Sequence, residues 1–184
     1  MREFLRRGGW LFLAILFIVT AVGVGIYAFI VNTHTNPNDQ SANYITCPVK
    51  KVGEQKPGKN GKYQGAQLVD FDTVKHVGYL QCWDTKVGSG ATAKATSTIT
   101  ATYTGALAST GKIFQSSLDT GQPFTTPLTQ VIPGWTAGIP GMKAGGTRRL
   151  LIPAQYAYGA SGSPQGGIPP NSDLVFDVTL IAVK

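Results

Sequence analysis

The sequence predicts an α+β domain with an antiparallel sheet and one short helix, preceded by a single N-terminal transmembrane helix. Two observations predict the domain: short segments of alternating polar and apolar residues follow residue 68, and glycines separate them. A third predicts the anchor, since residues 10–31 contain no charged side chain. Only 14% of the 184 residues are charged, against about a quarter in soluble domains. This composition fits one water-soluble domain with a hydrophobic segment attached.

The N-terminal apolar run has the length of a membrane span, because residues 10–31 form about 30 Å of helix. Arg2, Arg6 and Arg7 precede it, and no Lys or Arg follows until Lys50. The positive-inside rule then places residues 1–9 in the cytoplasm and everything after the run outside. A cleaved signal peptide is the alternative, but its apolar region usually has about 7–15 residues. We therefore expect a single-pass membrane protein with its domain on the extracytoplasmic side.

Residues 32–67 are rich in Asn, Thr, Lys, Gly and Gln, with little periodicity, and predict a solvated linker or stalk. Cys47 lies in this segment and Cys82 at the start of the domain. A disulfide tying stalk to domain outside the membrane and a pair of free thiols are both open. The net charge is +7, but the lysines of the stalk are not interleaved with aromatic residues. Nucleic acid is therefore not expected as a partner.

The pattern of residues 68–184 predicts that this segment forms the folded domain. In residues 98–107 every second side chain is a threonine over much of the segment, the period of a half-buried strand. The segment 131–139 (VIPGWTAGI) is the one helical candidate, with Pro133 in the first turn, where a missing N–H is harmless. Residues 174–183 are largely apolar on both faces, which favours a central strand. We expect about five strands and one short helix.

The residues that most catalytic sites need are missing or dispersed. His34 lies beside the predicted membrane span, and His76 has no His or Cys at ligand spacing. The sequence contains no G-x-S-x-G elbow, phosphate-binding loop or dinucleotide motif. Its carboxylates are scattered, which argues against a hydrolase with paired acids. No metal and no cofactor are expected.

Aromatic residues instead gather in the last hundred residues, several of them in turn-rich settings. Such settings often hold side chains at a surface concavity, although core packing is the alternative for any one ring. The motifs, in chain order, are YTG, F-x-S-S, VIPGW, YAYG, IPP and LVFDV. This collinear set resembles the FKBP-type peptidyl-prolyl cis–trans isomerases, and the resemblance covers about residues 78–184.

The resemblance implies a curved sheet wrapped around the short helix, with a proline pocket between them. It implies isomerisation (rotamase activity) of X–Pro bonds in proline-containing polypeptide segments, through an apolar pocket that favours the twisted amide. It also implies inhibition by macrolides such as FK506 and rapamycin. Trp135 would be the pocket floor, while the Tyr158 hydroxyl and the Ile132 backbone N–H would bind substrate carbonyls. The other implied substrate-binding residues are the walls Tyr103, Phe114, Val131 and Phe176, the rim residue Phe124, and Ile168 of an overhanging loop.

Two departures from the family pattern affect this site. Gln115 stands where the family commonly has an aspartate that partners the tyrosine hydroxyl. We expect glutamine in place of aspartate at this catalytic position to lower isomerase activity about tenfold, or about 1.4 kcal/mol, rather than abolish it. The loop before IPP is a residue longer and carries Ser163 where many relatives have histidine. With an export anchor, the first hypothesis is an isomerase of exported or envelope proteins; the alternative is a proline-segment-binding chaperone or adaptor with weak or no turnover.

Overall fold

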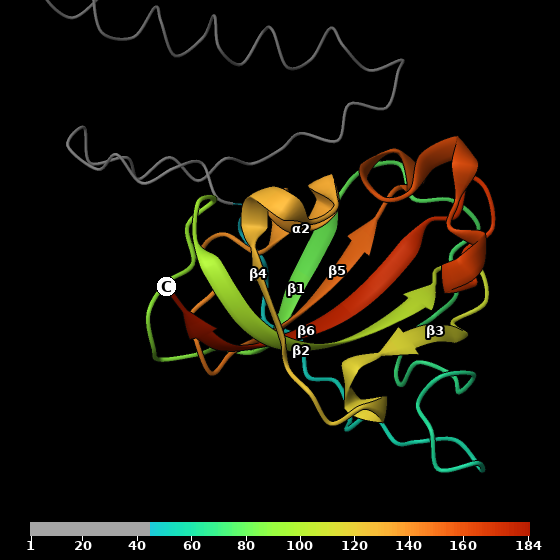
Figure 1. The fold of residues 1–184 in the computed structure, drawn as a ribbon, viewed down its shortest axis with the longest axis horizontal. Helices are drawn as coiled ribbons and strands as arrows, with labels where there is room; N and C mark the ends of the chain where they lie inside the picture. Colours follow the sequence, from blue (N-terminus) through green and yellow to red (C-terminus); the bar gives the residue numbers. More distant parts are fainter. Residues whose placement is uncertain (1–44) are drawn as a thin grey trace, which may run out of the picture. The chain divides into compact units, whose positions relative to one another are not determined.

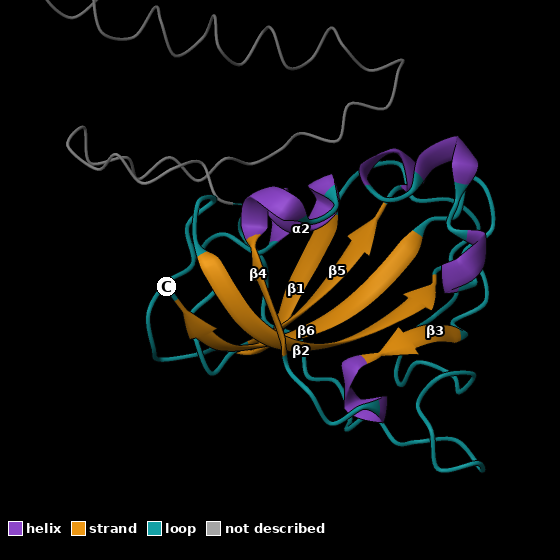
Figure 2. Ribbon diagram, viewed as in Figure 1, coloured by secondary structure: helices purple, strands orange, loops and turns teal. Residues whose placement is uncertain are grey.

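Six antiparallel strands form one twisted, curved sheet (Figure 1). In the computed structural model, which describes residues 45–184, the sheet order is β1-β5-β6-β2-β3, and β4 also pairs with β2. The strands are β1 (Gln81–Lys86), β2 (Thr98–Leu107), β3 (Ile113–Ser116), β4 (Phe124–Pro127), β5 (Thr147–Ile152) and β6 (Leu174–Val183). One α-helix, α2 (Pro133–Gly138), and several short 3₁₀ turns connect them within these residues (Figure 2). The predicted α+β class, an antiparallel sheet with one short helix, is confirmed.

Strands β3 and β4 share one edge of β2. Strand β4 pairs with β2 from Thr98 to Ala101, and β3 pairs with it from Thr104 to Ala106. The expected number of strands was one too low because β4 is short and has no apolar alternation. It also ends in Pro127, a residue that sheets accept almost only at edges and strand ends.

The main core lies on the inner face of the sheet, under α2. Gly134 and Gly138 of the helix face Ile152 and Leu150 so closely that a Cβ on either glycine would collide with these side chains. The absence of those Cβ atoms lets α2 lie directly on β5. The buried residues of this inner core are Ala93, Ile99, Ala101, Phe114, Leu128, Trp135, Ile139, Met142, Leu150, Ile152, Ile168, Leu174, Phe176, Val178 and Leu180.

The opposite, outer face of the sheet is covered by residues 45–80, which we call the N-terminal strap. Leu68 and Val77 of the strap are buried against Ala106, Leu151 and Val175 of the sheet. Leu151 and Val175 alternate along their strands with residues of the inner core, so the sheet buries apolar side chains on both faces. The strap therefore closes a second, smaller core.

Residues 45–67, the described part of the segment 32–67 that was predicted as a linker or stalk, belong to this strap. Cys47 and Cys82 are joined in a disulfide with their Cα atoms 5.1 Å apart. Beyond it, Lys50 N–H donates to the Asp84 carbonyl and Asp84 N–H to the Pro48 carbonyl, both at 2.9 Å, along the free edge of β1. The disulfide is one of the two alternatives left open by the sequence, whereas the backbone bonds leave no hydrophobic period and were not predicted.

Two neighbouring arginines of β5 tie the elements on each face together. Arg148 reaches the inner side, where it binds both carboxylate oxygens of Asp84, at 2.7 and 3.1 Å, and the Gly138 carbonyl at 2.8 Å. Arg149 points to the outer face, is fully buried, and binds both oxygens of Asp177, at 2.5 and 2.7 Å. Its remaining N–H groups bind two carbonyls of the strap. Both charges are therefore paired within the fold, as burial requires.

The predicted cytoplasmic segment 1–9 and the predicted anchor 10–31 lie outside the described residues. Within residues 45–184, no helix has the length and apolar character needed to cross a membrane.

Candidate functional site

A cavity of about 420 Å³ opens between α2 and the sheet. It is lined by Tyr103, Phe114, Gln115, Phe124, Gln130, Val131, Ile132, Trp135, Tyr158 and Phe176. The structure thus brings together every residue predicted for the site except Ile168, and adds Gln130. These residues come from β2, β3, β4, β6, α2 and two loops, so the cavity exists only when these elements have come together.

Edge-to-face aromatic contacts build the floor and walls of the cavity. The Trp135 ring lies 5.5 Å from the rings of both Tyr103 and Phe176, at interplanar angles of 81° and 88°. Phe114 packs on Phe176 at 5.8 Å and 84°. Such T-shaped pairs stabilise one another beyond their buried area. Trp135 is only 4% exposed, whereas Phe124 at the rim is 41% exposed, so the rings grade from a buried floor to an open mouth.

Gly105 makes the wall of phenylalanines possible. It pairs with Phe176 across β2 and β6, and a Cβ on it would lie 2.6 Å from ring atoms of both Phe114 and Phe176. Strand β3 also carries a bulge here: Gly105 pairs with Gln115 and Ala106 with Ile113, which leaves Phe114 without a partner on β2. Bulges re-aim side chains next to functional sites, and this one accompanies Phe114 at the cavity wall.

The start of α2 presents a backbone donor beside the cavity. Ile132 caps the helix, and its carbonyl accepts from the N–H groups of Trp135 and Thr136, at 2.9 and 3.2 Å. Its own N–H has no hydrogen-bond partner among residues 45–184. Thr136 fixes the helix further, since its hydroxyl donates to the Leu128 carbonyl at 2.7 Å. The Ile132 N–H is therefore a rigidly placed donor with no partner in the fold.

The polar atoms of the cavity are neutral. No charged side chain occurs in its lining. Burial, and then the neighbouring Tyr158 phenol, raise the pKa of Tyr103 above its ordinary value, so its hydroxyl keeps its proton to a higher pH than an ordinary tyrosine does. The hydroxyls of Tyr103 and Tyr158 have no hydrogen-bond partner in the described part of the chain, and the exposed Gln115 amide does not bond to Tyr158 there. These groups are free to bind a ligand.

Ile168 occupies a different place from the one implied by the resemblance. It is 2% exposed, belongs to the inner core and is not part of the cavity lining. Its N–H donates to the Ser163 carbonyl at 3.0 Å, and its carbonyl accepts from the Ser163 N–H at 2.8 Å. This pair closes the loop on itself, helped by the positive φ of Gly162 (63°). Ile168 therefore holds the base of the loop instead of overhanging the cavity.

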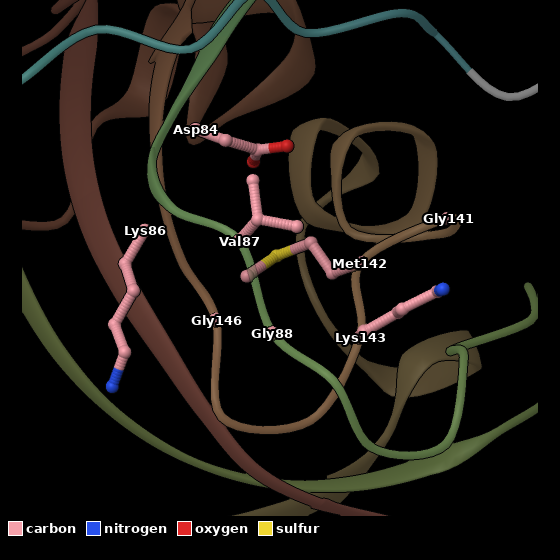
Figure 3. Close-up of a pocket in the computed structure, with 8 residues that line it drawn as sticks. All are labelled: Asp84, Lys86, Val87, Gly88, Gly141, Met142, Lys143 and Gly146. Carbon is pink, nitrogen blue, oxygen red and sulfur yellow. The ribbon is translucent and has the colours of Figure 1, made fainter.

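A second, smaller cavity of about 90 Å³ lies between β1 and the turn that follows α2 (Figure 3). Asp84 supplies its carboxylate, but both oxygens of that group are already bound by Arg148. Figure 3 shows the side chains of Lys86 and Lys143 pointing in opposite directions. No free functional groups converge on this cavity, so it is not the candidate site. Residues 45–184 also contain no cluster of His, Cys, Asp or Glu that could hold a metal ion.

Gln130 and Gly105 are the two site residues that the sequence analysis did not identify. Gln130 ends a 3₁₀ turn, is exposed, and lines the cavity, but it belongs to none of the quoted motifs. Its only signal in the sequence is its place directly before VIPGW. Gly105 belongs to the YTG motif, but its role depends on the rings of Phe114 and Phe176, which the motif does not contain.

The fold and the site together define a class of protein that binds a small apolar ring in an uncharged aromatic cavity, with neutral hydrogen-bond donors beside it. The family model for FKBP-type peptidyl-prolyl cis-trans isomerases matches residues 89–181, just over half of the chain. The chain belongs to this family, which in general binds proline-containing substrates and ligands of the FK506 type. The strap precedes the matched residues.

Individual relatives agree with this assignment. The FKBP-type isomerase FkpA of Aeromonas hydrophila is 41% identical over 135 residues, 73% of this chain and 47% of that protein. The crystal structure of FkpA from Escherichia coli is 43% identical with a TM-score of 0.53, covering 60% of this chain and 53% of that one. A peptidyl-prolyl isomerase from Pseudomonas syringae is 34% identical with a TM-score of 0.52, covering 60% and 80%. The chain spans less than half the length of the curated relatives it matches.

Proposed function

We propose that this protein is a peptidyl-prolyl cis–trans isomerase that acts on X–Pro bonds of exported or envelope proteins. One observation carries the proposal: an uncharged aromatic cavity with a tryptophan floor has free neutral donors, among them the Ile132 N–H and the Tyr158 hydroxyl. A proline ring fits the apolar floor, and the donors fit the carbonyls that flank it. The family match and the relatives support the same activity.

The reaction explains why the cavity has no acid, base or nucleophile. Rotation about the peptide bond faces a barrier of about 18–20 kcal/mol that comes from amide resonance, and no bond is broken. The planar amide carries more charge separation than the twisted form, so an uncharged cavity of low dielectric favours the twisted form. A thousandfold to millionfold acceleration requires only about 4–8 kcal/mol. Packing and one or two hydrogen bonds can supply it.

Each lining group has a place in this mechanism. Trp135 holds the proline ring, and the surrounding aromatic rings keep water away from the rotating bond. The Ile132 N–H and the Tyr158 hydroxyl bind the neighbouring carbonyls and hold the chain in a turn near the twisted geometry. Gln115 and Gln130 offer further amide groups at the mouth, where both side chains are exposed.

The test is an isomerisation assay with the full chain in mild detergent and a proline-containing peptide, without a coupling protease. We expect acceleration that FK506 inhibits. Trp135→Ala removes the floor and should abolish nearly all of it, while Trp83→Ala removes a tryptophan from the outer face and should keep it. Thermal unfolding of both variants checks that each one folds. Full acceleration by Trp135→Ala would disprove the pocket assignment.

A proline-binding chaperone or adaptor without turnover is the second candidate. The observation that favours it is the missing hydrogen bond between Gln115 and Tyr158, which leaves the tyrosine hydroxyl without a fixed orientation. Such a protein would bind FK506 and suppress the aggregation of an unfolded, proline-rich protein, but would not accelerate isomerisation. The same assay, with FK506 affinity measured in parallel, separates the two candidates.

We also propose that residues 10–31 anchor the protein in a membrane, with the catalytic domain on the extracytoplasmic side. The uncharged run and the arginines before it support this orientation. The Cys47–Cys82 disulfide supports it as well, because such bonds persist mainly in oxidising compartments. Protease added to intact cells or spheroplasts should digest the domain and spare a short N-terminal fragment. Full protection in spheroplasts would contradict this orientation.

A further inference from the structure

Strand β3 is a short edge strand of the cavity wall. It has four residues, lies at the edge of the sheet and carries both Phe114 and Gln115 of the lining. Its ladder with β2 is interrupted by the bulge, so Phe114 has no partner on β2. An edge strand leaves a row of backbone donors and acceptors open unless something covers it. At Phe114 the backbone of β3 is therefore open to a partner other than β2.

The strap supplies the missing partner, running along the outer edge of β3 (Figure 1). Gly65 N–H donates to the Ile113 carbonyl at 2.8 Å, and Ile113 N–H donates to the Ala66 carbonyl at 2.9 Å. The side-chain amide of Gln64 then donates to the carbonyl of Phe114 at 2.8 Å. The bulged residue is thus held by a side chain of the strap.

Gln64 is itself held by the turn that follows β3. The carboxylate of Asp119 accepts from the N–H of Tyr63 at 2.6 Å and from the N–H of Gln64 at 2.9 Å. These bonds to a carboxylate fix the strap backbone at the residue whose side chain reaches Phe114. Gln64, Phe114 and Asp119 therefore form one connected arrangement across the edge of β3.

We infer that Gln64, fixed by Asp119, is a positioning residue for the substrate cavity: it sets the place of Phe114 and so the shape of the wall against which proline packs. The strap precedes the residues matched by the family model, so this contact is an addition to the matched domain. The inference rests on the proposed function, because it assigns the cavity as the substrate site. Gln64 is not a lining residue, and its hydrogen bond goes to the backbone carbonyl of Phe114, so it acts through the backbone of β3.

The strap provides a matched control. Gln55 is also a glutamine of the strap; its amide donates to the carbonyls of Lys56 and Gln67, at 3.0 and 3.1 Å, and accepts from Val69 N–H at 2.8 Å. It makes more hydrogen bonds than the Gln64 side chain, but none of them to β3. A purely structural role for these glutamines predicts that Gln55→Ala is at least as harmful as Gln64→Ala. A positioning role predicts the opposite order for ligand binding.

The experiment compares Gln64→Ala, Gln64→Glu and Gln55→Ala in the full chain. Glutamate has nearly the size of glutamine but no N–H donor, so Gln64→Glu removes the bond to Phe114 while keeping the volume and adds a negative charge; Gln64→Ala removes the same bond without adding a charge. We expect both Gln64 variants to bind FK506 about threefold to tenfold more weakly, the range for loss of one hydrogen bond. Most of the change in isomerisation should appear in KM and little in kcat, because Trp135 and Ile132 are untouched. Gln55→Ala should bind as the wild type does.

Amide hydrogen exchange gives a readout that needs no activity. Exchange at residues 113–116 should accelerate in the Gln64 variants and stay at the wild-type rate in Gln55→Ala. Unchanged exchange there, or equal loss of FK506 affinity in the Gln64 and Gln55 variants, would overturn the inference. If the wild type proves to bind FK506 without isomerising, the proposed function fails, but affinity and exchange still decide the role of Gln64.

Discussion

Replacing Gly105 by alanine adds one methyl group at the point where β2 passes beneath two rings of the cavity. The new Cβ would lie 2.6 Å from Phe114 Cζ and 2.6 Å from Phe176 Cε1. Carbon atoms in contact normally stay about 3.5–4.0 Å apart, so each ring must move by about 1 Å. Both residues are buried, at 8% and 4% exposure, and pack on each other edge to face. The rings cannot move without opening contacts elsewhere in the wall.

The energy of this change follows from two opposing effects. Overpacking a filled core costs about 1–3 kcal/mol. Alanine also restricts the unfolded chain, which stabilises a protein by about 0.4–1 kcal/mol at an unstrained position. Gly78→Ala isolates the second effect, since Gly78 is exposed, has no atom within 4 Å of its ideal Cβ and has no positive φ. The difference between Gly105→Ala and Gly78→Ala should therefore be about 1–3 kcal/mol.

Urea denaturation gives the free energy of unfolding of both variants, and the isomerisation assay gives their kcat/KM. We expect Gly105→Ala to be less stable than Gly78→Ala and to lose activity, because the displaced rings narrow the cavity. Gly78→Ala should keep the activity of the wild type. If Gly105→Ala proves as stable and as active as Gly78→Ala, then Phe114 and Phe176 do not meet across Gly105, and the described wall is wrong.

Three further predictions concern charge, the disulfide and pH. Gln115→Asp should raise kcat/KM about tenfold, or about 1.4 kcal/mol, by giving Tyr158 a charged partner; an unchanged rate would show that this position does not limit activity. Cys47→Ser combined with Cys82→Ser should lower the free energy of unfolding by about 2–4 kcal/mol, measured without reductant, and a reductant should bring the wild type to the same value. The raised pKa of Tyr103 means that the folded protein keeps a proton that the unfolded chain loses above about pH 10. Stability should therefore fall as the pH rises past that value, and Tyr103→Phe should reduce the fall in urea denaturation at pH 9–11.

The inner half of the fold could be predicted because its signals are local in the sequence. Residues 98–107 alternate with the period of a strand, and Pro133 marks the first turn of the only α-helix described. The cavity lining was predicted through motifs whose order along the chain is that of a known family. Those motifs include the aromatic rings themselves, and the structure places the rings in one cavity.

The attachment of the strap could be predicted only in part. The Cys47–Cys82 disulfide was one of two open alternatives, whereas bonds through carbonyl and N–H groups and through the guanidinium of Arg149 leave no period or motif. The strap has no helix and no long strand, so its buried side chains, such as Leu68 and Val77, show no regular spacing either. The position of Ile168 was missed for a related reason, since the loop closes through backbone bonds to Ser163. In both cases the backbone groups that form the hydrogen bonds occur in almost every residue type, so the sequence does not indicate which residues pair.

The distribution of charge shows why a search for catalytic acids and bases in this sequence had to fail. Arg148 and Arg149 hold Asp84 and Asp177, and the carboxylate of Asp173 accepts from two backbone N–H groups. These charged groups stabilise the contacts between strap, sheet and helix. Rotation about the peptide bond breaks no bond, so it needs no charged acid, base or nucleophile at the rotating amide. The charges of this domain therefore serve its architecture, and the cavity is lined by neutral groups.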